Sequence, residues 1–270
     1  MRERLRAVSF RPVSAPSEST RGQLRSLVVH LARRRLESEH RLTALGWLWP
    51  LVRQLAQLLV LVVVFGSVLD LGIEDYPLFV FAGLLVWTWF AAALSGATTA
   101  LITDRHLVYS PRLPNMVIPL VAVVVPLADV LLVLPVLLGM LAIDGRLEWT
   151  VLLLPVLLTV QFALTAGLGL MSSALNVYFR DVQNIVGVGL LLFFYLTPVF
   201  YGVKNVPEQY RWLLHVNPMT PLINSVRAVL LDGELPRWQD MAIACPVAIA
   251  ALLAGIAVFR RLEANFVDEL

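Results

Sequence analysis

Charged residues are scarce in this 270-residue sequence. Asp, Glu, Lys and Arg make up 15% of it, 59% is hydrophobic and the mean hydropathy is +0.78. Soluble domains carry about 25% charged residues. So little polar surface cannot cover a water-soluble globule. The composition argues against a soluble enzyme, a nucleic-acid binder and a disordered scaffold, and it predicts an integral membrane protein.

Residue types that carry catalysis and metal binding are also few. The chain has one cysteine, one lysine and four histidines, and the histidines are scattered without the spacing of a metal site. The sequence contains no glycine-rich loop of the kind that cradles nucleotide phosphates. We therefore expect no catalytic residue, no metal and no cofactor in this chain. Any ATP hydrolysis that drives it must belong to another subunit.

Long runs without charged residues make up most of the sequence after the first fifty residues. A helix needs about 20 apolar residues to cross a hydrocarbon core of about 30 Å. The runs predict six transmembrane helices, at about residues 51–70, 78–102, 116–142, 149–176, 183–203 and 241–260. They lack the alternating segments of about 10 residues that barrel strands show. The expected fold is therefore an all-α integral membrane protein with a six-span domain over residues 46–260.

Arginine is distributed unevenly about these spans. It crowds the region before the first span and the loops on the same side, whereas the opposite loops together carry five basic residues. Basic loops stay in the cytoplasm. We expect both termini, including a short tail over residues 261–270, to be cytoplasmic, which agrees with an even number of spans.

Two segments outside the spans have a distinct pattern. Residues 1–20 predict a mobile cytoplasmic tail, and residues 21–45 predict a basic amphipathic helix at the membrane surface. That helix suits an anchor on anionic lipid, a docking surface for a cytoplasmic partner, or both. Residues 204–240 are too polar to span and too apolar for a solvated loop, and Asn217-Pro218 divides them. They predict an outer or re-entrant helical hairpin.

Asp129 is the one acidic residue in the middle of a predicted span. At that depth a carboxylate costs about 2.5–3.5 kcal/mol, so it should face the bundle interior or water. One interpretation places it in a transport pathway or a gating pair. The alternative is a protonated or hydrogen-bonded carboxyl that bonds across helices, to Gln161 or Asn176.

Aromatic residues suggest a second set of pathway candidates. Rings near span ends usually form an interfacial belt, but a ring-lined channel would also suit a saccharide, whose C–H faces stack on them. The candidates are Trp87, Trp89, Phe90, Tyr178, Phe179, Tyr195 and Tyr201. The adjacent Arg180 and Asp181 lie in the tight turn between spans four and five. They either terminate helices or brace a cytoplasmic gate.

Four stretches of the sequence resemble one known family. They are residues 45–50 (LGWLWP), residues 76–79 (YPLF) with 83–87 (GLLVW), residues 176–182 (NVYFRDV), and residues 197–201 (TPVFY) with 206–207 (VP) and 217–219 (NPM). Together they cover most of residues 40–235. The pattern is similar to the permease subunits of ABC exporters for polysaccharides, the O-antigen and teichoic-acid exporter family.

The resemblance implies a homodimer of six-span subunits in the bacterial cytoplasmic membrane, with two ATPase subunits that carry ATP and Mg beneath it. Such an assembly moves lipid-linked glycans, of O-antigen, teichoic-acid or cell-wall galactan type, out through a channel at the dimer interface. The channel of that family is lined by aromatic residues, so the resemblance also raises the functional weight of Trp87, Trp89, Tyr195 and Tyr201. The implied ATPase-coupling residues are Arg33, Arg34, Arg35, Asp104, Arg105, His106 and Arg112.

Other functions stay open at this stage. An ABC permease that exports small hydrophobic drugs or lipids would have a similar layout. A membrane-embedded glycosyltransferase would need a cluster of acidic residues or a metal site at a membrane face, and the sequence shows none. A secondary transporter would work without an ATPase, but the spans show no clear inverted repeat.

Overall fold

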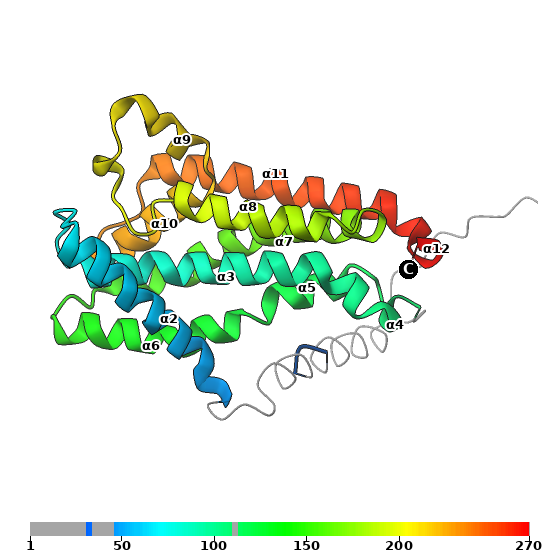
Figure 1. Ribbon diagram of the computed structural model, residues 1–270, viewed down its shortest axis with the longest axis horizontal. Helices are drawn as coiled ribbons and strands as arrows, with labels where there is room; N and C mark the ends of the chain where they lie inside the picture. Colours follow the sequence, from blue (N-terminus) through cyan, green and yellow to red (C-terminus); the bar gives the residue numbers. More distant parts are fainter. Residues whose placement is uncertain (1–30, 34–45, 110–112, 270) are drawn as a thin grey trace, which may run out of the picture.

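The computed structural model describes residues 31–33, 46–109 and 113–269, and in these ranges every regular element is a helix. The long helices run side by side along the long axis of the molecule (Figure 1). The first half contains η1 (Gly46–Leu48), α2 (Trp49–Leu61), η2 (Val62–Val68), α3 (Tyr76–Thr103), α4 (Arg105–Val108), α5 (Val117–Val124) and α6 (Leu127–Ile143). The second half contains η3 (Trp149–Leu153), α7 (Leu154–Tyr178), α8 (Val182–Leu196), η4 (Val203–Asn205), η5 (Glu208–Tyr210), α9 (Arg211–Val216), α10 (Met219–Arg227), η6 (Ala228–Asp232), α11 (Trp238–Leu262), η7 (Glu263–Asn265) and α12 (Phe266–Glu269).

Five helical stretches in the described part of the chain are long and apolar enough to cross a membrane. They are Gly46–Val68, Tyr76–Thr103, Val117–Ile143, Trp149–Tyr178 and Trp238–Asn265. The chain is therefore an all-α, multi-pass membrane protein, as its composition predicted. The remaining apolar helix, α8, has 15 residues. It is about 22 Å long, shorter than a hydrocarbon core of about 30 Å, so the sixth span stays a prediction.

Helix α3 forms the centre of the bundle. It contacts α2, α5, α6, α7, α8 and α10, and its side chains are apolar on all sides, as expected for a buried helix. Polar groups on α3 and α7 pair with each other: Thr98 and Ser172 hydroxyls lie 2.8 Å apart, and Gln161 donates to the Val86 carbonyl at 2.7 Å. These pairs satisfy polar groups that lipid cannot.

Helices α7 and α11 pack along their length with very close backbones. A Cβ atom on Gly255 would lie 2.1 Å from the Gly167 carbonyl oxygen, and a Cβ on Gly167 would lie 2.3 Å from the Ala251 backbone. Small residues permit this approach, which is a common source of association between membrane helices. Glycine at both positions is therefore required by the packing.

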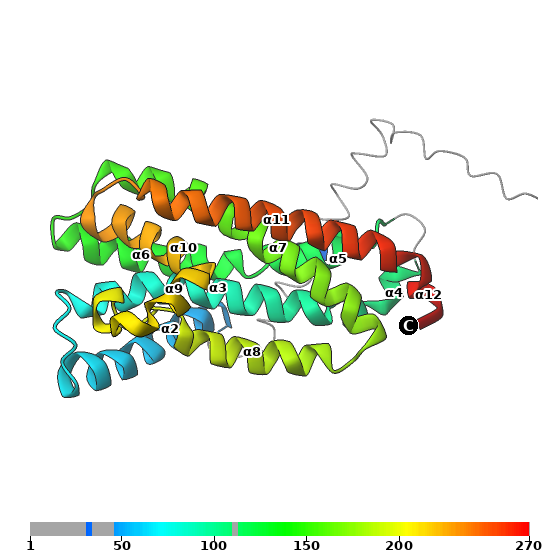
Figure 2. The ribbon, with the colours of Figure 1, turned by 90° about the horizontal axis from the view of Figure 1, so that it is seen from above.

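The segment 204–240 lies at one end of the molecule, opposite to α4 and α12 (Figures 1 and 2). We call these the hairpin end and the α4 end. Helix α9 lies at the edge of the hairpin end, whereas α10 is buried against α3 and α11. Asn217 separates them: its Oδ1 accepts from the Met219 backbone at 2.8 Å and its Nδ2 donates to the Thr197 hydroxyl at 2.8 Å. The split expected at Asn217-Pro218 thus coincides with a side chain that fixes both parts to the end of α8.

The terminal segments differ in how much the structure describes. The expected tail over residues 1–20 lies outside the described residues, as does most of the expected amphipathic helix over 21–45, of which only residues 31–33 are described, as helix. At the other terminus, residues 261–269 of the expected tail over 261–270 are helical and fold onto the bundle. Phe266 is fully buried, and its ring lies 5.3 Å from that of Phe259.

Candidate functional site

Several predicted coupling and gating residues lie at the α4 end. Arg105 and His106 are exposed on α4, and Asp104 is half-buried at the end of α3. Arg180 and Asp181 are exposed in the turn between α7 and α8 at the same end. Two short exposed turns therefore present charged side chains at the same end of the molecule. Of the remaining coupling residues, Arg33 is exposed, and three lie outside the described residues: Arg34, Arg35 and Arg112.

Asn176 anchors the turn that carries Arg180 and Asp181. Its buried Nδ2 donates to the Thr98 carbonyl at 3.0 Å, and its Oδ1 accepts from the Gln183 backbone at 3.1 Å. One side chain thus connects the end of α7, the start of α8 and the last turns of α3. A displacement of this turn would be transmitted to the bundle core rather than absorbed by a loose loop.

The two aromatic candidates beside this turn have different surroundings. The Tyr178 hydroxyl donates to the Leu262 carbonyl at 2.9 Å, and its ring lies 6.3 Å from that of Phe266. Tyr178 therefore holds the end of α11 and α12 against α7. Phe179 is 65% exposed and points away from the protomer core.

Four of the other aromatic candidates join one cluster toward the hairpin end. Trp87 lies 5.7 Å from Phe90 and 5.5 Å from Phe194, measured between ring centroids. Further ring contacts run from Phe194 through Phe200, Tyr195 and Tyr201, and from Phe200 to Phe65. Edge-to-face and tilted pairs at such distances stabilise packing.

The members of this aromatic cluster differ sharply in exposure. Trp87 and Phe90 are 5% and 2% exposed, whereas Tyr195 is 59% exposed. The Tyr201 hydroxyl donates to the Tyr195 carbonyl at 3.1 Å. Tyr195 therefore exposes its ring and Tyr201 is half-buried, while Trp87 and Phe90 are buried on α3.

Trp89 lies apart from the cluster, beside a pocket of about 200 Å³ between α2, α3 and α6 that also contains Asp129. The Trp89 indole N–H donates to the Val123 carbonyl at 3.2 Å. Neither suggested amide partner of Asp129 lines this pocket: Gln161 bonds to α3, and Asn176 bonds at the α7–α8 turn. Asp129 thus lies among other polar groups, which include Arg53 and Gln54.

Arg227 is a site residue that the sequence did not single out. It is 6% exposed, and its guanidinium donates to the carbonyls of Phe79 at 3.2 Å, Pro198 at 2.7 Å and Val199 at 2.6 Å. Burial lowers the pKa of Arg227 to about 9, so the group is still a cation at pH 7. Gly83 leaves room for it, since a Cβ there would lie 2.7 Å from the guanidinium.

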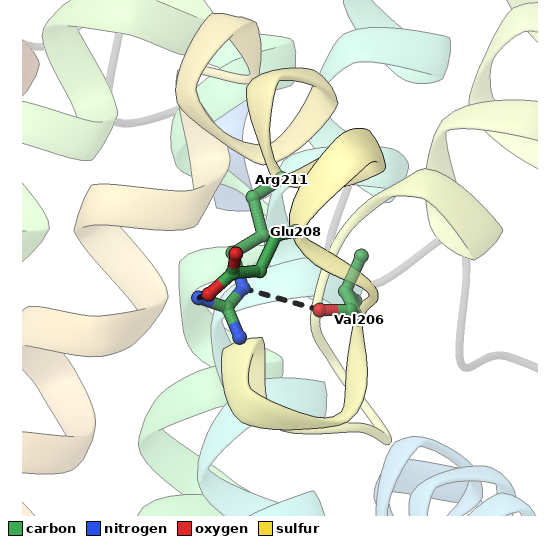
Figure 3. Close-up of polar contacts among 3 residues, drawn as sticks. All are labelled: Val206, Glu208 and Arg211. Atoms are coloured by element: carbon green, nitrogen blue, oxygen red, sulfur yellow. Dashed lines mark hydrogen bonds and ion pairs between the residues drawn. The ribbon is translucent and has the colours of Figure 1, made fainter.

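Near the surface of the hairpin end, a second arginine makes weaker contacts. Arg211 donates from Nε to the Val206 carbonyl at 3.1 Å and pairs with Glu208 at 3.5 Å (Figure 3). Glu208 is largely exposed, so water competes for this pair. Arg227 and Arg211 therefore differ in burial: Arg227 holds the core together, whereas Arg211 orders a surface turn.

The polar groups of these sites form hydrogen bonds between helices and line one pocket. In the described ranges, no group of three or more His, Cys, Asp or Glu side chains is placed to hold a metal ion. Such an arrangement suits holding and moving helices and contacting a polar solute.

A family model described as ABC-2 type transporter matches residues 26–231. The chain belongs to this family. The match takes in the α4 turn, the α7–α8 turn and both parts of the hairpin end. The ABC-2 domain thus includes every described candidate site.

Individual relatives agree with the family. The chain is 32% identical to the O-antigen export system permease protein RfbA of Myxococcus xanthus, over 92% of this chain and 96% of that protein. It is 28% identical to a protein of the same name from Klebsiella pneumoniae, again over 92% and 96%. It is also 23% identical to the polysialic acid transport protein KpsM of Escherichia coli, over 81% and 86%.

Proposed function

We propose that this chain is the transmembrane permease of an ATP-driven exporter of a lipid-linked polysaccharide. The observation that carries the proposal is its similarity, over 96% of their length, to two O-antigen export permeases. The similarity to a polysialic acid transport protein extends the substrate class to polysaccharides with different sugars. What these relatives share is a long glycan, which favours polysaccharide export over export of small hydrophobic drugs.

The pathway would form between two copies of the chain. Helix α3 fills the centre of the bundle and is buried among its neighbours, so we do not expect a continuous path for a glycan chain through a single copy. Helix α8 instead has an exposed apolar face that no described helix covers. This face consists of Ile185, Val188, Leu191, Leu192 and Tyr195. A two-fold homodimer would place the same surface of each copy against the other, and a channel between the two copies would run beside this face. We call this channel the seam. Tyr195 and Tyr201 would then be the aromatic residues that contact the glycan.

Energy would enter at the α4 end. Two ATPase subunits, which hold ATP and Mg, would bind the exposed α4 turn and the basic segment before α2. Asn176 would transmit their movement to α3 and α8 through its two hydrogen bonds. In this arrangement the α4 end and both termini face the cytoplasm, the hairpin end faces outward, and the protein lies in the bacterial cytoplasmic membrane among its lipids.

Export from reconstituted vesicles tests the proposal. The chain is purified with its ATPase partner, and ATP-dependent transfer of a lipid-linked glycan is measured against transfer of hydrophobic drugs. We expect Arg105→Glu to reduce glycan transfer strongly. Lys204 is an exposed basic residue at the hairpin end, and we expect Lys204→Glu to leave glycan transfer unchanged. Transport of drugs but of no lipid-linked glycan would overturn the substrate class, and transport without any ATPase would overturn the mechanism.

A further inference from the structure

The pocket between α2, α3 and α6 is lined by more polar groups than packing requires. Its polar lining consists of Arg53, Gln54, Gln57, Thr88 and Asp129, and the Trp89 side chain forms part of its wall. Arg53 and Ala92 are exposed, and they form its open side. Its volume of about 200 Å³ exceeds the share of several water molecules, at about 30 Å³ each. The pocket can therefore hold a small organic group.

Gln54 is the residue that points to a ligand. It is 5% exposed, and its Nε2 has no hydrogen-bond partner, while Oε1 lies 3.1 Å from the Thr88 hydroxyl. Thr88 has one hydroxyl hydrogen, which it donates to the Leu84 carbonyl at 2.7 Å. The carboxamide can also be placed the other way round, with its nitrogen donating to Thr88 and its oxygen in the place of Nε2. As the side chain stands, Nε2 is a buried donor without an acceptor, which is costly in a membrane.

The lining favours a neutral group that both donates and accepts hydrogen bonds. The described lining sets one basic side chain, Arg53, against one carboxyl group, Asp129, whereas phosphate is typically bound by several charged or N–H donors. A sugar hydroxyl can satisfy Gln54 in either orientation, because it donates and accepts. Amide, carboxyl and hydroxyl groups beside an indole wall give a sugar ring both polar partners and an apolar face.

We propose that this pocket binds one neutral saccharide unit within each protomer. The proposal rests on the proposed export of a glycan and specifies where the chain holds a sugar. Gln54, Gln57, Thr88 and Asp129 would form hydrogen bonds with the hydroxyl groups of the sugar. The Trp89 indole would contact its apolar face. The pocket lies on the opposite side of α3 from the exposed Tyr195, so it is a holding site distinct from the aromatic surface.

Thiol protection tests this site without depending on transport. In the complex with its ATPase in nanodiscs, Cys245→Ser removes the single native thiol and Ala92→Cys places one at the mouth of the pocket. Octyl glucoside, below its solubilising concentration, should slow labelling by N-ethylmaleimide about tenfold at ten times its dissociation constant. Octyl phosphate, which has the same chain and a charged head, should give little protection. Leu59→Cys, on the exposed face of α2, should be unaffected by either probe.

Two further variants decide whether the pocket itself is responsible. Gln54→Leu should abolish protection of the Ala92→Cys thiol, whereas Gln183→Leu, which removes an exposed carboxamide on α8, should preserve it. Protection by octyl phosphate alone would overturn the proposal in favour of an anion site, and equal protection at Leu59→Cys would reduce it to detergent partitioning. If neither probe slows labelling, the pocket holds only water and the proposal is wrong. Glycan export measured in parallel keeps the two proposals separate: export without protection overturns this site, and protection without export overturns the proposed function.

Discussion

The guanidinium carbon of Arg227 lies 3.4 Å from the centroid of the Phe79 ring, so a fully buried cation stacks on the aromatic face of a neighbouring helix. The same guanidinium donates to the Phe79 carbonyl and to two carbonyls just after α8. The Tyr76 hydroxyl also bonds to this segment, through the Phe200 carbonyl at 2.7 Å. The hairpin end is therefore held to the bundle through the backbone of residues 198–200, where α8 has ended and the carbonyls lack helical partners.

Arg227→Met should destabilise the protein strongly. The apolar side chain fills similar space but leaves three buried carbonyls unsatisfied, and loss of a buried charged partner of this kind costs about 3–5 kcal/mol. Arg227→Lys should recover only part of the loss, because a point ammonium cannot reproduce the planar fork. Thermal unfolding in detergent, followed by tryptophan fluorescence, measures the effect. Arg211→Met, which removes the surface arginine of the same end, should cost about 0.5 kcal/mol or less. Equal losses from the two variants would contradict the role assigned to Arg227.

Gly255→Ala should separate α7 from α11. The added Cβ would lie 2.1 Å from the Gly167 carbonyl oxygen, and a backbone atom cannot move aside as a side chain can. We expect a loss of about 3 kcal/mol or more, at the upper end of the range for overpacking. Gly189→Ala on α8 meets no atom within 4 Å and should leave stability unchanged or slightly higher. Yield and melting temperature in detergent compare the two, and a Gly255→Ala protein as stable as wild type would disprove the close approach.

Much of this fold could be predicted from the sequence, because lipid imposes simple requirements on length and charge. The uncharged runs placed the long helices, and Asn217-Pro218 indicated where the hairpin divides. Arg227 could not be identified in this way. It is one of five basic residues in the predicted outer loops. Its three hydrogen-bond acceptors are backbone carbonyls, which every residue has, so the sequence gives no signal for them.

The aromatic candidates show the same limit at the level of the site. Residue type marked Trp87 and Tyr195 equally, although one is 5% and the other 59% exposed. What separates them is the helix that carries each one: α3 is surrounded by neighbours, while α8 has one uncovered side. Because the exposure of a side chain depends on how the helices pack, only the structure could distinguish the exposed aromatic residues from the buried ones.

Asp129→Asn should fold normally and keep partial export activity. An amide retains the shape of the carboxyl and one acceptor in the pocket, while Asp129→Leu removes all hydrogen bonding there and should reduce export further. The comparison is made at equal protein levels in vesicles with the ATPase partner. A complete loss of transport by Asp129→Asn, with the melting temperature preserved, would instead show that its negative charge is needed.

Trp87→Ala and Tyr195→Ala should have opposite profiles. Trp87 is a buried centre of the aromatic cluster, so its truncation leaves a cavity and should cost about 3–5 kcal/mol of stability. Tyr195 is largely exposed, and its truncation should change stability by about 0.5–1 kcal/mol but lower the rate of glycan export, because the ring surface beside the proposed seam is lost. Melting temperature and export per folded protein are measured for both variants. The opposite result would be wild-type export by Tyr195→Ala and lowered export by Trp87→Ala that has been folded at low temperature. In that case the ring that contacts the glycan is that of Trp87, and the pathway runs closer to α3 than the exposed face of α8 indicates.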